Sequence, residues 1–344
     1  MKKKIGILTG GGDCPGLNPA IKGCVWAADR FGYECVGINE GWRGLVEGLT
    51  MPLNCGNTEY EITHGGTILG TSRTNPFKQD GAVKKCLDNF GKLGLHALVA
   101  MGGEDTLGVA TRLYAEHNVN VVGVPKTMDN DLSVTDYTFG FDTSVTRAMD
   151  AAACLVDTGR SHRRVMVLEV MGRHAGWVAL YTAIASAADF VCIPERKIDT
   201  EAMIKKVKEA YARKKFALVV TSEASELAEA GEGGQKRELD QFGHIILKDR
   251  GMGERIAGFI EKHTGIETRS SVIGHMQRGG APTLFDRMLG LRVGVKAAEL
   301  VRDGKWGQMS AQVGNRIVGV PLADATGKLK TVTEDWYGLM DILF

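Results

Sequence analysis

The sequence predicts an α/β protein built from two doubly wound domains. Short apolar runs that fit strands alternate with longer periodic segments that fit helices, and short loops join them. A length of 344 residues makes two domains the natural expectation. Glycine is frequent, at 45 residues, and proline is rare, at 8, which suits many strand-to-helix turns that approach a ligand closely.

The overall composition excludes several classes of protein. The formal net charge is only +1, so no general field attracts nucleic acid or an acidic membrane, and any anion site must be built locally. No apolar run reaches a membrane-spanning length, and the N-terminus has no signal-peptide core. The seven cysteines include no CxxC pair, which favours small core residues in a reducing compartment. We therefore expect a cytoplasmic protein without nucleic-acid or membrane partners.

In the first half of the chain, apolar runs predict strands and the periodic segments between them predict helices. The predicted strands cover residues 4–9, 33–38, 96–101 and 119–123. The predicted helices cover residues 17–30, about 106–117 and 141–156. Several of the loops that follow these strands carry glycines and acids, at the edge where open α/β sheets bind ligands.

The second half repeats the alternation. Strands are predicted at residues 165–170, 190–193, 216–221, 267–274 and 315–321. Helices are predicted from about 176 to 187 and at 200–215, 253–264 and 284–303. Residues 224–250 combine glycine and charge without a period, which indicates a mobile loop with a short apolar piece near 245–247. Residues 330–344 are interpreted as a tail.

Two glycine-rich loops are candidates for anion binding. Gly10-Gly11-Gly12 lies between a predicted strand and a predicted helix, where bare backbone N–H groups can surround an anion. It is neither a P-loop nor a dinucleotide fingerprint, and an ordinary tight turn explains it equally well. The second loop, residues 65–76, carries Arg73, whose planar guanidinium suits phosphate, although a solvated loop arginine is the commoner case.

Two acidic segments also follow strands. In Pro125–Asp131, an extended backbone would point Asp129 and Asp131 the same way, with Lys126 close enough to hold an anion. An Asx-rich turn is the competing interpretation. Glu104 and Asp105 begin a helix, where an acid often acts only as a cap. Two adjacent acids are better explained by a shared divalent cation, since Mg²⁺ uses one or two carboxylates plus substrate phosphates.

These segments together resemble the 6-phosphofructokinase family over nearly the whole chain. The matching motifs, in order, are GGGDCPGLN, GGTILGTSR, GGEDT, PKTMDND, VMGRHAG and GHMQRGG. The resemblance is greatest to the pyrophosphate-dependent branch of bacterial size, because the ATP-using branch usually has glycine where this chain has Asp105 and Lys126. Glu104 departs from the commoner aspartate, which lengthens a metal ligand by one methylene.

The resemblance implies a chemical role for residues of two motifs. Asp129 would be the general base that takes the proton from the sugar 1-hydroxyl, and Asp131 would support it beside the metal. Thr127 would hydrogen-bond the transferring phosphate, and Arg173 would neutralise its charge. Phosphoryl transfer depends mainly on positioning and on stabilising spread negative charge, which agrees with these roles.

The resemblance also implies two domains with the active site in the cleft between them. Residues 1–139 plus about 251–303 would bind pyrophosphate and Mg²⁺, with the metal on Glu104 and pyrophosphate on Gly11, Gly12, Arg73 and Lys126. Residues 140–250 plus about 304–344 would form the fructose 6-phosphate domain, and this sugar phosphate would be held by Met171, Gly172, Glu223, His275 and Arg278. In a homodimer or homotetramer, Arg164 and Arg269 would reach this sugar phosphate from a neighbouring subunit.

Electrostatics supports the exclusion of nucleotides. A carboxylate ~4 Å from an α-phosphate costs on the order of 4 kcal/mol at an effective dielectric of about 20, roughly a thousandfold in binding. Asp105 and the bulk of Lys126 should therefore exclude ATP and admit pyrophosphate. The competing interpretations are an ATP-dependent 6-phosphofructokinase, a nicotinamide-nucleotide or lipid kinase, and a sugar-phosphate binder without catalysis. A core histidine remains an alternative for His275, and plain packing for Met171.

Overall fold

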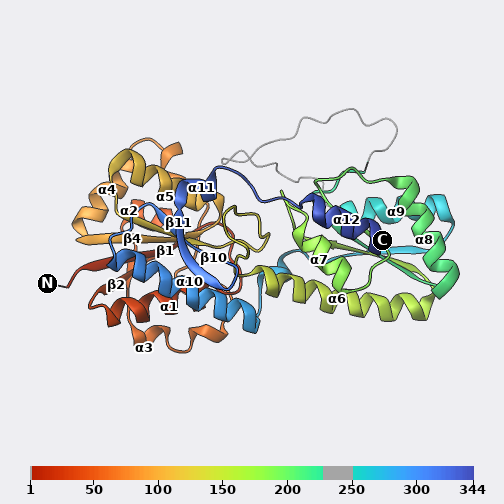
Figure 1. The fold of residues 1–344 in the computed structure, drawn as a ribbon, viewed down its shortest axis with the longest axis horizontal. Helices are drawn as coiled ribbons and strands as arrows, with labels where there is room; N and C mark the ends of the chain where they lie inside the picture. Colours follow the sequence, from red (N-terminus) through yellow and green to blue (C-terminus); the bar gives the residue numbers. More distant parts are fainter. Residues whose placement is uncertain (1, 228–250) are drawn as a thin grey trace. The chain divides into compact units, whose positions relative to one another are not determined.

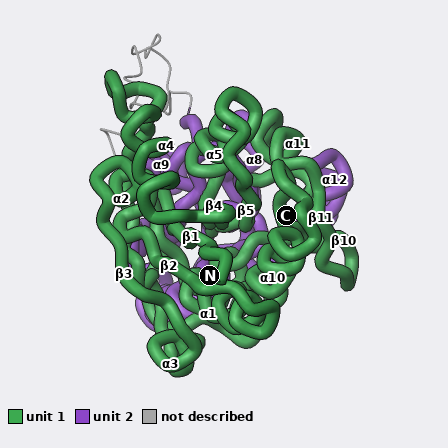
Figure 2. Tube along the Cα trace, turned by 90° about the vertical axis from the view of Figure 1, so that its left-hand side faces the viewer, with its two compact units in different colours: residues 1–128, 132–142, 278–329 green, residues 129–131, 143–277, 330–344 purple. Residues whose placement is uncertain are grey.

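The computed structural model describes residues 2–227 and 251–344, which form two compact units. Unit 1 comprises residues 1–128, 132–142 and 278–329, and unit 2 comprises residues 129–131, 143–277 and 330–344 (Figure 2). Each unit has its own sheet and core, so each is described by itself. The predicted α/β class is confirmed.

Unit 1 contains a seven-stranded sheet in the order β11-β10-β5-β4-β1-β2-β3. The five inner strands run parallel, and β11 and β3 pair antiparallel at the two edges. The central strands are almost wholly buried, as expected when helices cover both faces of a parallel sheet. The strands are β1 (Lys4–Thr9), β2 (Glu34–Ile38), β3 (Thr50–Leu53), β4 (Leu95–Gly102), β5 (Val121–Pro125), β10 (Gln308–Val313) and β11 (Arg316–Pro321).

Helices cover both faces of this sheet (Figure 1). One face packs against α2 (Trp42–Glu47), α4 (Ala82–Lys92), α5 (Glu104–His117) and α11 (Leu322–Thr326). Two further helices, α1 (Leu17–Arg30) and α10 (Leu284–Arg302), pack directly on each other, while α3 (Cys55–Thr58) is a single turn. A Cβ on Gly294 would lie 2.1 Å from the Ala20 carbonyl oxygen, so the close approach of α1 and α10 requires glycine.

Unit 2 contains a four-stranded parallel sheet in the order β7-β8-β6-β9. Its strands are β6 (Val165–Val170), β7 (Phe190–Cys192), β8 (Ala217–Ser222) and β9 (Thr268–Val272). Its core packs one sheet face against α8 (Thr200–Lys214) and α9 (Met252–Thr264). The long helix α6 (Phe141–His162) lies on the other side, and α7 (Trp177–Ala185) and α12 (Glu334–Leu343) complete the unit (Figure 1).

Several predicted elements differ from the observed ones. The bounds of β1 and α1 match the prediction, but the prediction of a tail at residues 330–344 is wrong, because α12 forms there. Strand β10 was not predicted. The contact division also differs from the predicted domains: β9 pairs with β6 in unit 2, while in unit 1 β10 pairs with β5 and β11 pairs with β10. The roles assigned to the two domains and their shared cleft stay predictions.

Two further predictions concern the loop at 224–250 and the membrane. Most of that loop, residues 228–250, lies outside the described residues. None of the helices within residues 2–227 and 251–344 is both long and apolar enough to cross a bilayer.

Candidate active site

The two predicted glycine loops lie side by side in unit 1. The Gly10 N–H donates to the Met101 carbonyl, and the Gly11 N–H donates to the Ser72 carbonyl at 3.1 Å. The Thr71 hydroxyl donates to the Gly11 carbonyl at 2.5 Å. Gly11 has a φ of 80°, which glycine adopts without strain. Residues far apart in the sequence therefore form one loop cluster, with the exposed Arg73 directly after Ser72.

Lys126 brings a buried positive charge to this cluster. Its residue is only 4% exposed, and its ammonium donates to the Gly12 carbonyl at 2.5 Å. A Cβ on Gly11 would lie 3.4 Å from the Lys126 Nζ, so the side chain lies directly against the loop. A buried ammonium is costly unless it is hydrogen-bonded or meets negative charge. The Gly12 carbonyl supplies such a hydrogen bond here, and the lysine brings a positive charge to the glycine loop.

Helix α5 begins beside the same lysine. A Cβ on Gly103 would lie 3.4 Å from the Lys126 carbonyl oxygen, and Glu104 and Asp105 follow in the first turn. Among the described residues, no group of three or more histidine, cysteine, aspartate or glutamate side chains could hold a metal. One or two carboxylates at this position fit Mg²⁺ that takes its remaining ligands from substrate phosphates and water.

Arg278 also belongs to the glycine-loop cluster. Its Nη1 donates to the Asp13 carbonyl at 3.0 Å, and a Cβ on Gly12 would lie only 2.7 Å from the same nitrogen. The lack of a side chain at Gly12 therefore leaves room for the Arg278 guanidinium. The predicted contact of Arg278 with the sugar phosphate stays a prediction.

In unit 2, the Asp129–Asp131 segment differs from its predicted extended form. Met128 and Asp129 lie in a turn, and Asn130 has a φ of 52°, in the left-handed region. Asparagine tolerates this conformation better than most residues because its side chain can hydrogen-bond locally. The argument that two extended residues point the same way is therefore wrong here, and the competing interpretation of a turn rich in aspartate and asparagine describes the backbone.

Three predicted sugar-phosphate residues lie at the carboxyl ends of β6 and β8. The Met171 N–H donates to the Gln277 Oε1 at 2.7 Å, and the Ser222 hydroxyl donates to the Gly172 carbonyl at 2.5 Å. The Glu223 N–H donates to the Val170 carbonyl at 2.9 Å, which places Glu223 next to Met171 and Gly172. The structure brings these three residues together and leaves Arg173, which follows Gly172, on the same loop.

Gln277 is a site residue that sequence reasoning missed. It is completely buried, and its Nε2 donates to the Ser144 hydroxyl at 3.0 Å while its oxygen accepts from Met171. It thereby joins the short helical turn Gly274–Arg278 to α6 and to the loop that follows β6. A glutamine inside the GHMQRGG motif was the available signal. In the same turn, His275 is exposed, which argues against the core-histidine alternative.

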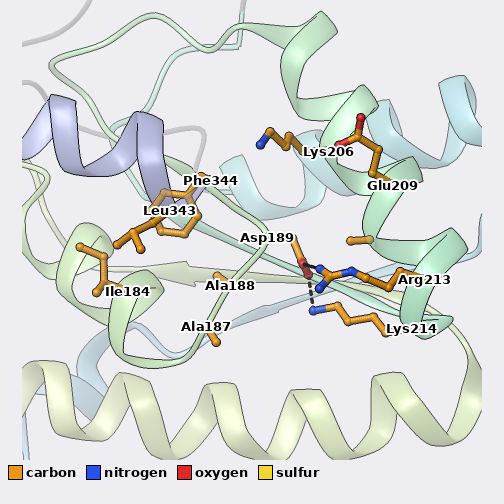
Figure 3. A pocket seen from close by; sticks show the side chains of 11 residues that line it. Ile184, Ala187, Ala188, Asp189, Lys206, Glu209, Arg213, Lys214, Leu343 and Phe344 are labelled. Carbon is orange, nitrogen blue, oxygen red and sulfur yellow. Dashed lines mark ion pairs between the residues drawn. The ribbon is translucent and has the colours of Figure 1, made fainter.

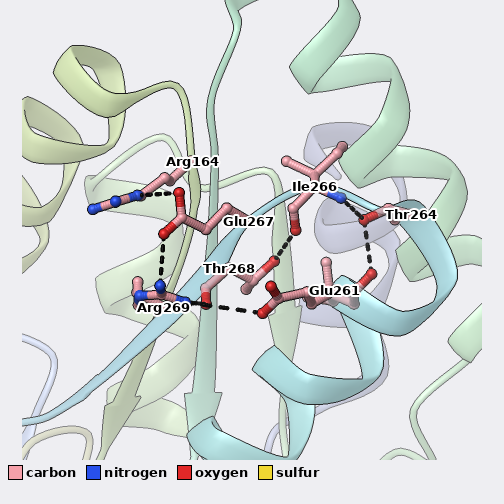
Figure 4. A network of polar contacts seen from close by, with 8 residues as sticks. Arg164, Glu261, Thr264, Ile266, Glu267, Thr268 and Arg269 are labelled. Carbon is pink, nitrogen blue, oxygen red and sulfur yellow. Dashed lines mark hydrogen bonds and ion pairs between the residues drawn. The ribbon is translucent and has the colours of Figure 1, made fainter.

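Arg164 and Arg269 meet at one carboxylate beside β9 (Figure 4). The Arg164 Nε lies 2.8 Å from one oxygen of Glu267, and the Arg269 Nη2 lies 2.6 Å from the other. Arg269 also lies 3.9 Å from Glu261. The hydrogen bond from Arg164 and the charges of both arginines lower the pKa of the Glu267 carboxyl below its ordinary value. The two predicted arginines are therefore neighbours: Arg269 lies on the edge strand β9, and Arg164 directly precedes the adjacent strand β6.

A cavity of about 530 Å³ in unit 2 contains none of the predicted site residues (Figure 3). Its wall includes Asp189, whose carboxylate lies 2.8 Å from the Lys214 ammonium and accepts from the Leu218 N–H at 2.9 Å. Asp189 is therefore already paired with a cation and a backbone donor.

Comparison with known proteins identifies the family. The sequence pattern of phosphofructokinases matches residues 4–301. The chain belongs to the phosphofructokinase family. It is 47% identical to the pyrophosphate–fructose 6-phosphate 1-phosphotransferase of Streptomyces coelicolor, over 99% of each chain. It is also 44% identical to ATP-dependent 6-phosphofructokinase 2 of the same organism, over 96% of this chain and 97% of that one.

A solved structure supports the fold of this phosphofructokinase. The pyrophosphate-dependent phosphofructokinase from Nitrosospira multiformis aligns with a TM-score of 0.84 at 19% identity, over 96% of this chain and 86% of that one. At this identity the likeness concerns the fold alone. Because relatives with either phosphoryl donor have similar identities, the donor has to be argued from individual residues.

Proposed function

We propose that this phosphofructokinase transfers a phosphoryl group from pyrophosphate to the 1-hydroxyl of fructose 6-phosphate, reversibly, giving fructose 1,6-bisphosphate and phosphate. The observation that carries the donor assignment is the buried Lys126 ammonium on the Gly12 carbonyl. Its charge favours a compact anion, and its bulk fills space that a nucleotide would need. The first-turn carboxylate of Asp105 would repel the α-phosphate of ATP.

The chemical step assigns one role to each side chain. Asp129 takes the proton from the 1-hydroxyl as its oxygen bonds to phosphorus, and the bond from phosphorus to the leaving phosphate breaks. Asp131 supports Asp129, and Thr127 hydrogen-bonds the transferring group. Arg173 neutralises the charge that spreads over its oxygens.

Pyrophosphate is held by the glycine-loop cluster, through Gly11, Gly12, Arg73 and Lys126. Mg²⁺, when bound to Glu104, supplies positive charge that screens the phosphate oxygens. Fructose 6-phosphate is held through Met171, Gly172, Glu223, His275 and Arg278. Met171, Gly172 and Glu223 are each hydrogen-bonded at the carboxyl ends of β6 and β8, to Gln277, Ser222 and Val170 respectively, which supports this group as one binding surface.

The proposal includes a homodimer or homotetramer, in which Arg164 and Arg269 contribute to a neighbouring subunit's sugar-phosphate site. Their position beside β9 supports this, because an edge strand offers unpaired backbone groups to another chain. Val272 on the same strand is 56% exposed. A neighbouring subunit that packed on β9 would bury this apolar side chain.

We also propose a cytoplasmic location. All seven cysteines, each within the described ranges, are free, and five are buried. Burial raises the pKa of the Cys14 thiol to about 12, so it stays protonated and unreactive. Such cysteines suit a reducing compartment.

A donor assay tests the proposed function directly. The enzyme is given fructose 6-phosphate and Mg²⁺ with either pyrophosphate or ATP, and fructose 1,6-bisphosphate is measured. We expect kcat/KM with pyrophosphate to exceed that with ATP by roughly a thousandfold, the repulsion estimated for one carboxylate. Equal or greater turnover with ATP would reverse the donor assignment and favour an ATP-dependent enzyme.

The variant Asp129→Asn tests whether the protein is a catalyst rather than a sugar-phosphate binder. A lost general base should lower kcat by roughly a hundredfold to ten-thousandfold. The dissociation constant for fructose 6-phosphate, measured by calorimetry, should change little because the amide keeps the size of the side chain. Normal turnover in this variant would remove Asp129 from the mechanism.

A further inference from the structure

The segment after α11 runs alongside the Asp129–Asp131 motif. Leu329 forms an antiparallel bridge with Leu132, and the Ser133 hydroxyl donates to the Lys328 carbonyl. The Lys330 N–H then donates to the Asp131 carbonyl at 2.8 Å. Residues about 200 positions apart are thus paired like two short strands, so the C-terminal segment fixes the backbone on one side of the motif.

The same segment is attached to the loop that carries Arg173. The Trp177 Nε1 donates to the Lys330 carbonyl at 2.9 Å. One carboxylate oxygen of Glu195 accepts from the Val332 N–H at 3.1 Å and from the Gly176 N–H at 2.8 Å. Both the N–H and the carbonyl of Lys330 are therefore engaged, which leaves its backbone little freedom.

The Lys330 side chain reaches the middle of the motif. Its ammonium donates to the Asn130 Oδ1 at 3.0 Å. Asn130 is 3% exposed and has a φ of 52°, so it is a buried, left-handed residue directly between the two aspartates. A buried amide needs a hydrogen-bond partner, and the conformation of Asn130 sets the directions in which Asp129 and Asp131 leave the backbone.

We propose that Lys330 is a positioning residue for phosphoryl transfer, which acts by holding Asn130 and thereby orienting Asp129 and Asp131. This inference rests on the proposed function, since it concerns the orientation of the proposed general base. Lys330 contributes a hydrogen bond and a positive charge to a segment rich in carboxylates, from a stretch whose sequence looks like a tail. A small misplacement of a catalytic group can reduce the rate about a hundredfold.

An anchor for α12 would be a purely structural role for the same residue. Trp177 separates the two roles, because it binds the Lys330 carbonyl and packs against Trp336 of α12, with ring centroids 5.9 Å apart. Trp177→Phe removes the anchoring hydrogen bond and leaves the ammonium on Asn130. A structural role predicts that this variant and Lys330→Met behave alike, whereas a positioning role predicts that only Lys330→Met lowers kcat strongly.

The kinetic test compares Lys330→Met with Lys330→Arg and with a matched control, Lys328→Met. Lys328 is exposed and contributes only its carbonyl to the pairing. We expect Lys330→Met to lower kcat by about tenfold to a hundredfold with little change in the KM for fructose 6-phosphate. Lys330→Arg should recover most of the rate. Lys328→Met should match the wild type.

A double-mutant cycle tests whether Lys330 acts through Asn130. If it does, Lys330→Met combined with Asn130→Ala should lower kcat no further than the more damaging single variant. Effects that multiply would overturn the proposal, and so would a wild-type kcat in Lys330→Met. The wild type is assayed first with pyrophosphate and with ATP, so a wrong donor is recognised separately and the comparison continues with the donor that works.

Amide hydrogen exchange supplies a readout that does not depend on turnover. In Lys330→Met, peptides covering residues 128–133 should exchange faster than in the wild type, because Asn130 loses the hydrogen bond from the Lys330 ammonium. Lys328→Met should leave them unchanged. Unaltered exchange in Lys330→Met would overturn the proposal even if the enzyme proved inactive with both donors.

Discussion

Two groups of cationic side chains in this molecule are held in different ways. In the glycine-loop cluster of unit 1, the Lys126 ammonium and the Arg278 guanidinium donate to the carbonyl oxygens of Gly12 and Asp13. In unit 2, Arg164 and Arg269 share the carboxylate of Glu267. A carbonyl is a neutral acceptor, whereas a carboxylate offsets part of the charge of the cation that it binds.

Because of this difference, we expect the two groups of cations to bind phosphate with different strength. The hydrogen bond from Lys126 to the Gly12 carbonyl uses one of the three donors of the ammonium. To bind an anion, Arg164 and Arg269 would have to weaken their ion pairs with Glu267. The free energy that they gain from the anion is therefore reduced by the free energy lost from those ion pairs. We therefore expect removal of a glycine-loop cation to cost more than removal of an edge-strand arginine.

The largest effect in this comparison is expected for Lys126→Met. A hydrogen bond to a charged group contributes about 1.5–3 kcal/mol, so kcat/KM for pyrophosphate should fall roughly tenfold to more than a hundredfold. Lys22→Met is the matched control, because its ammonium also donates to a carbonyl, that of Glu59, but at an exposed position of unit 1. If both variants had equal kinetics, the buried cation would have no special role in donor binding.

Asp105→Gly should have the next largest effect, a weaker use of pyrophosphate. The variant removes a carboxylate from the first turn of α5, where it interacts favourably with the helix N-terminus. ATP should not become a good donor, because Lys126 still occupies the glycine loop. Kinetics with both donors check this, and unchanged pyrophosphate kinetics would remove Asp105 from the mechanism.

Much of unit 1 could be predicted from the sequence because its signals are local. Glycines that directly follow apolar runs mark the loops after β1 and β4, and both loops lie where parallel strands end. The missed strand β10 has polar residues, Ser310 and Gln312, that are buried all the same, so hydrophobic periodicity did not reveal it. For α12 the signals existed: Thr333 at the N-cap, followed by Glu334 and Asp335.

The unpredicted parts of the site depend on contacts between distant segments. Nothing near Lys330 in the sequence indicates that it reaches Asn130, and nothing near Gln277 indicates that it reaches Met171 and Ser144. The division of the chain into units was hard to predict for the same reason, since the pairing of β9 with β6 does not follow from the order of elements. Local sequence patterns predict where loops occur, but they do not predict which loops come into contact in the folded chain.

A smaller effect is expected for Arg269→Ala in unit 2. The KM for fructose 6-phosphate should rise by about tenfold, near the low end of a charged hydrogen bond, while kcat changes little. Arg302→Ala is the control, because Arg302 also pairs with a neighbouring acid, Asp303, on the surface of unit 1. An unchanged KM in Arg269→Ala would show that this arginine does not contact the sugar phosphate.

Mixing two variants tests whether Arg269 acts across subunits. When Asp129→Asn and Arg269→Ala chains are dissociated and reassembled together, each mixed pair regains one site with an intact Asp129 and an intact Arg269. Activity at low fructose 6-phosphate should then exceed the sum of the separate variants. No gain in the mixture would place Arg269 in its own subunit's site or outside it.

The smallest effect concerns stability and comes from Glu267→Gln. The arginines hold the pKa of Glu267 below its ordinary value, so its ionised form stabilises the fold at pH well above 4.5, and this contribution disappears as the pH falls through the lowered pKa. Urea unfolding should therefore show a slightly lower midpoint for the variant at pH 7, and the difference should shrink below pH 4.5. Because the pair is exposed, the difference at pH 7 should be small. A difference that stayed constant with pH would mean that packing, rather than charge, is lost, and the contrast between the two groups of cations would no longer hold.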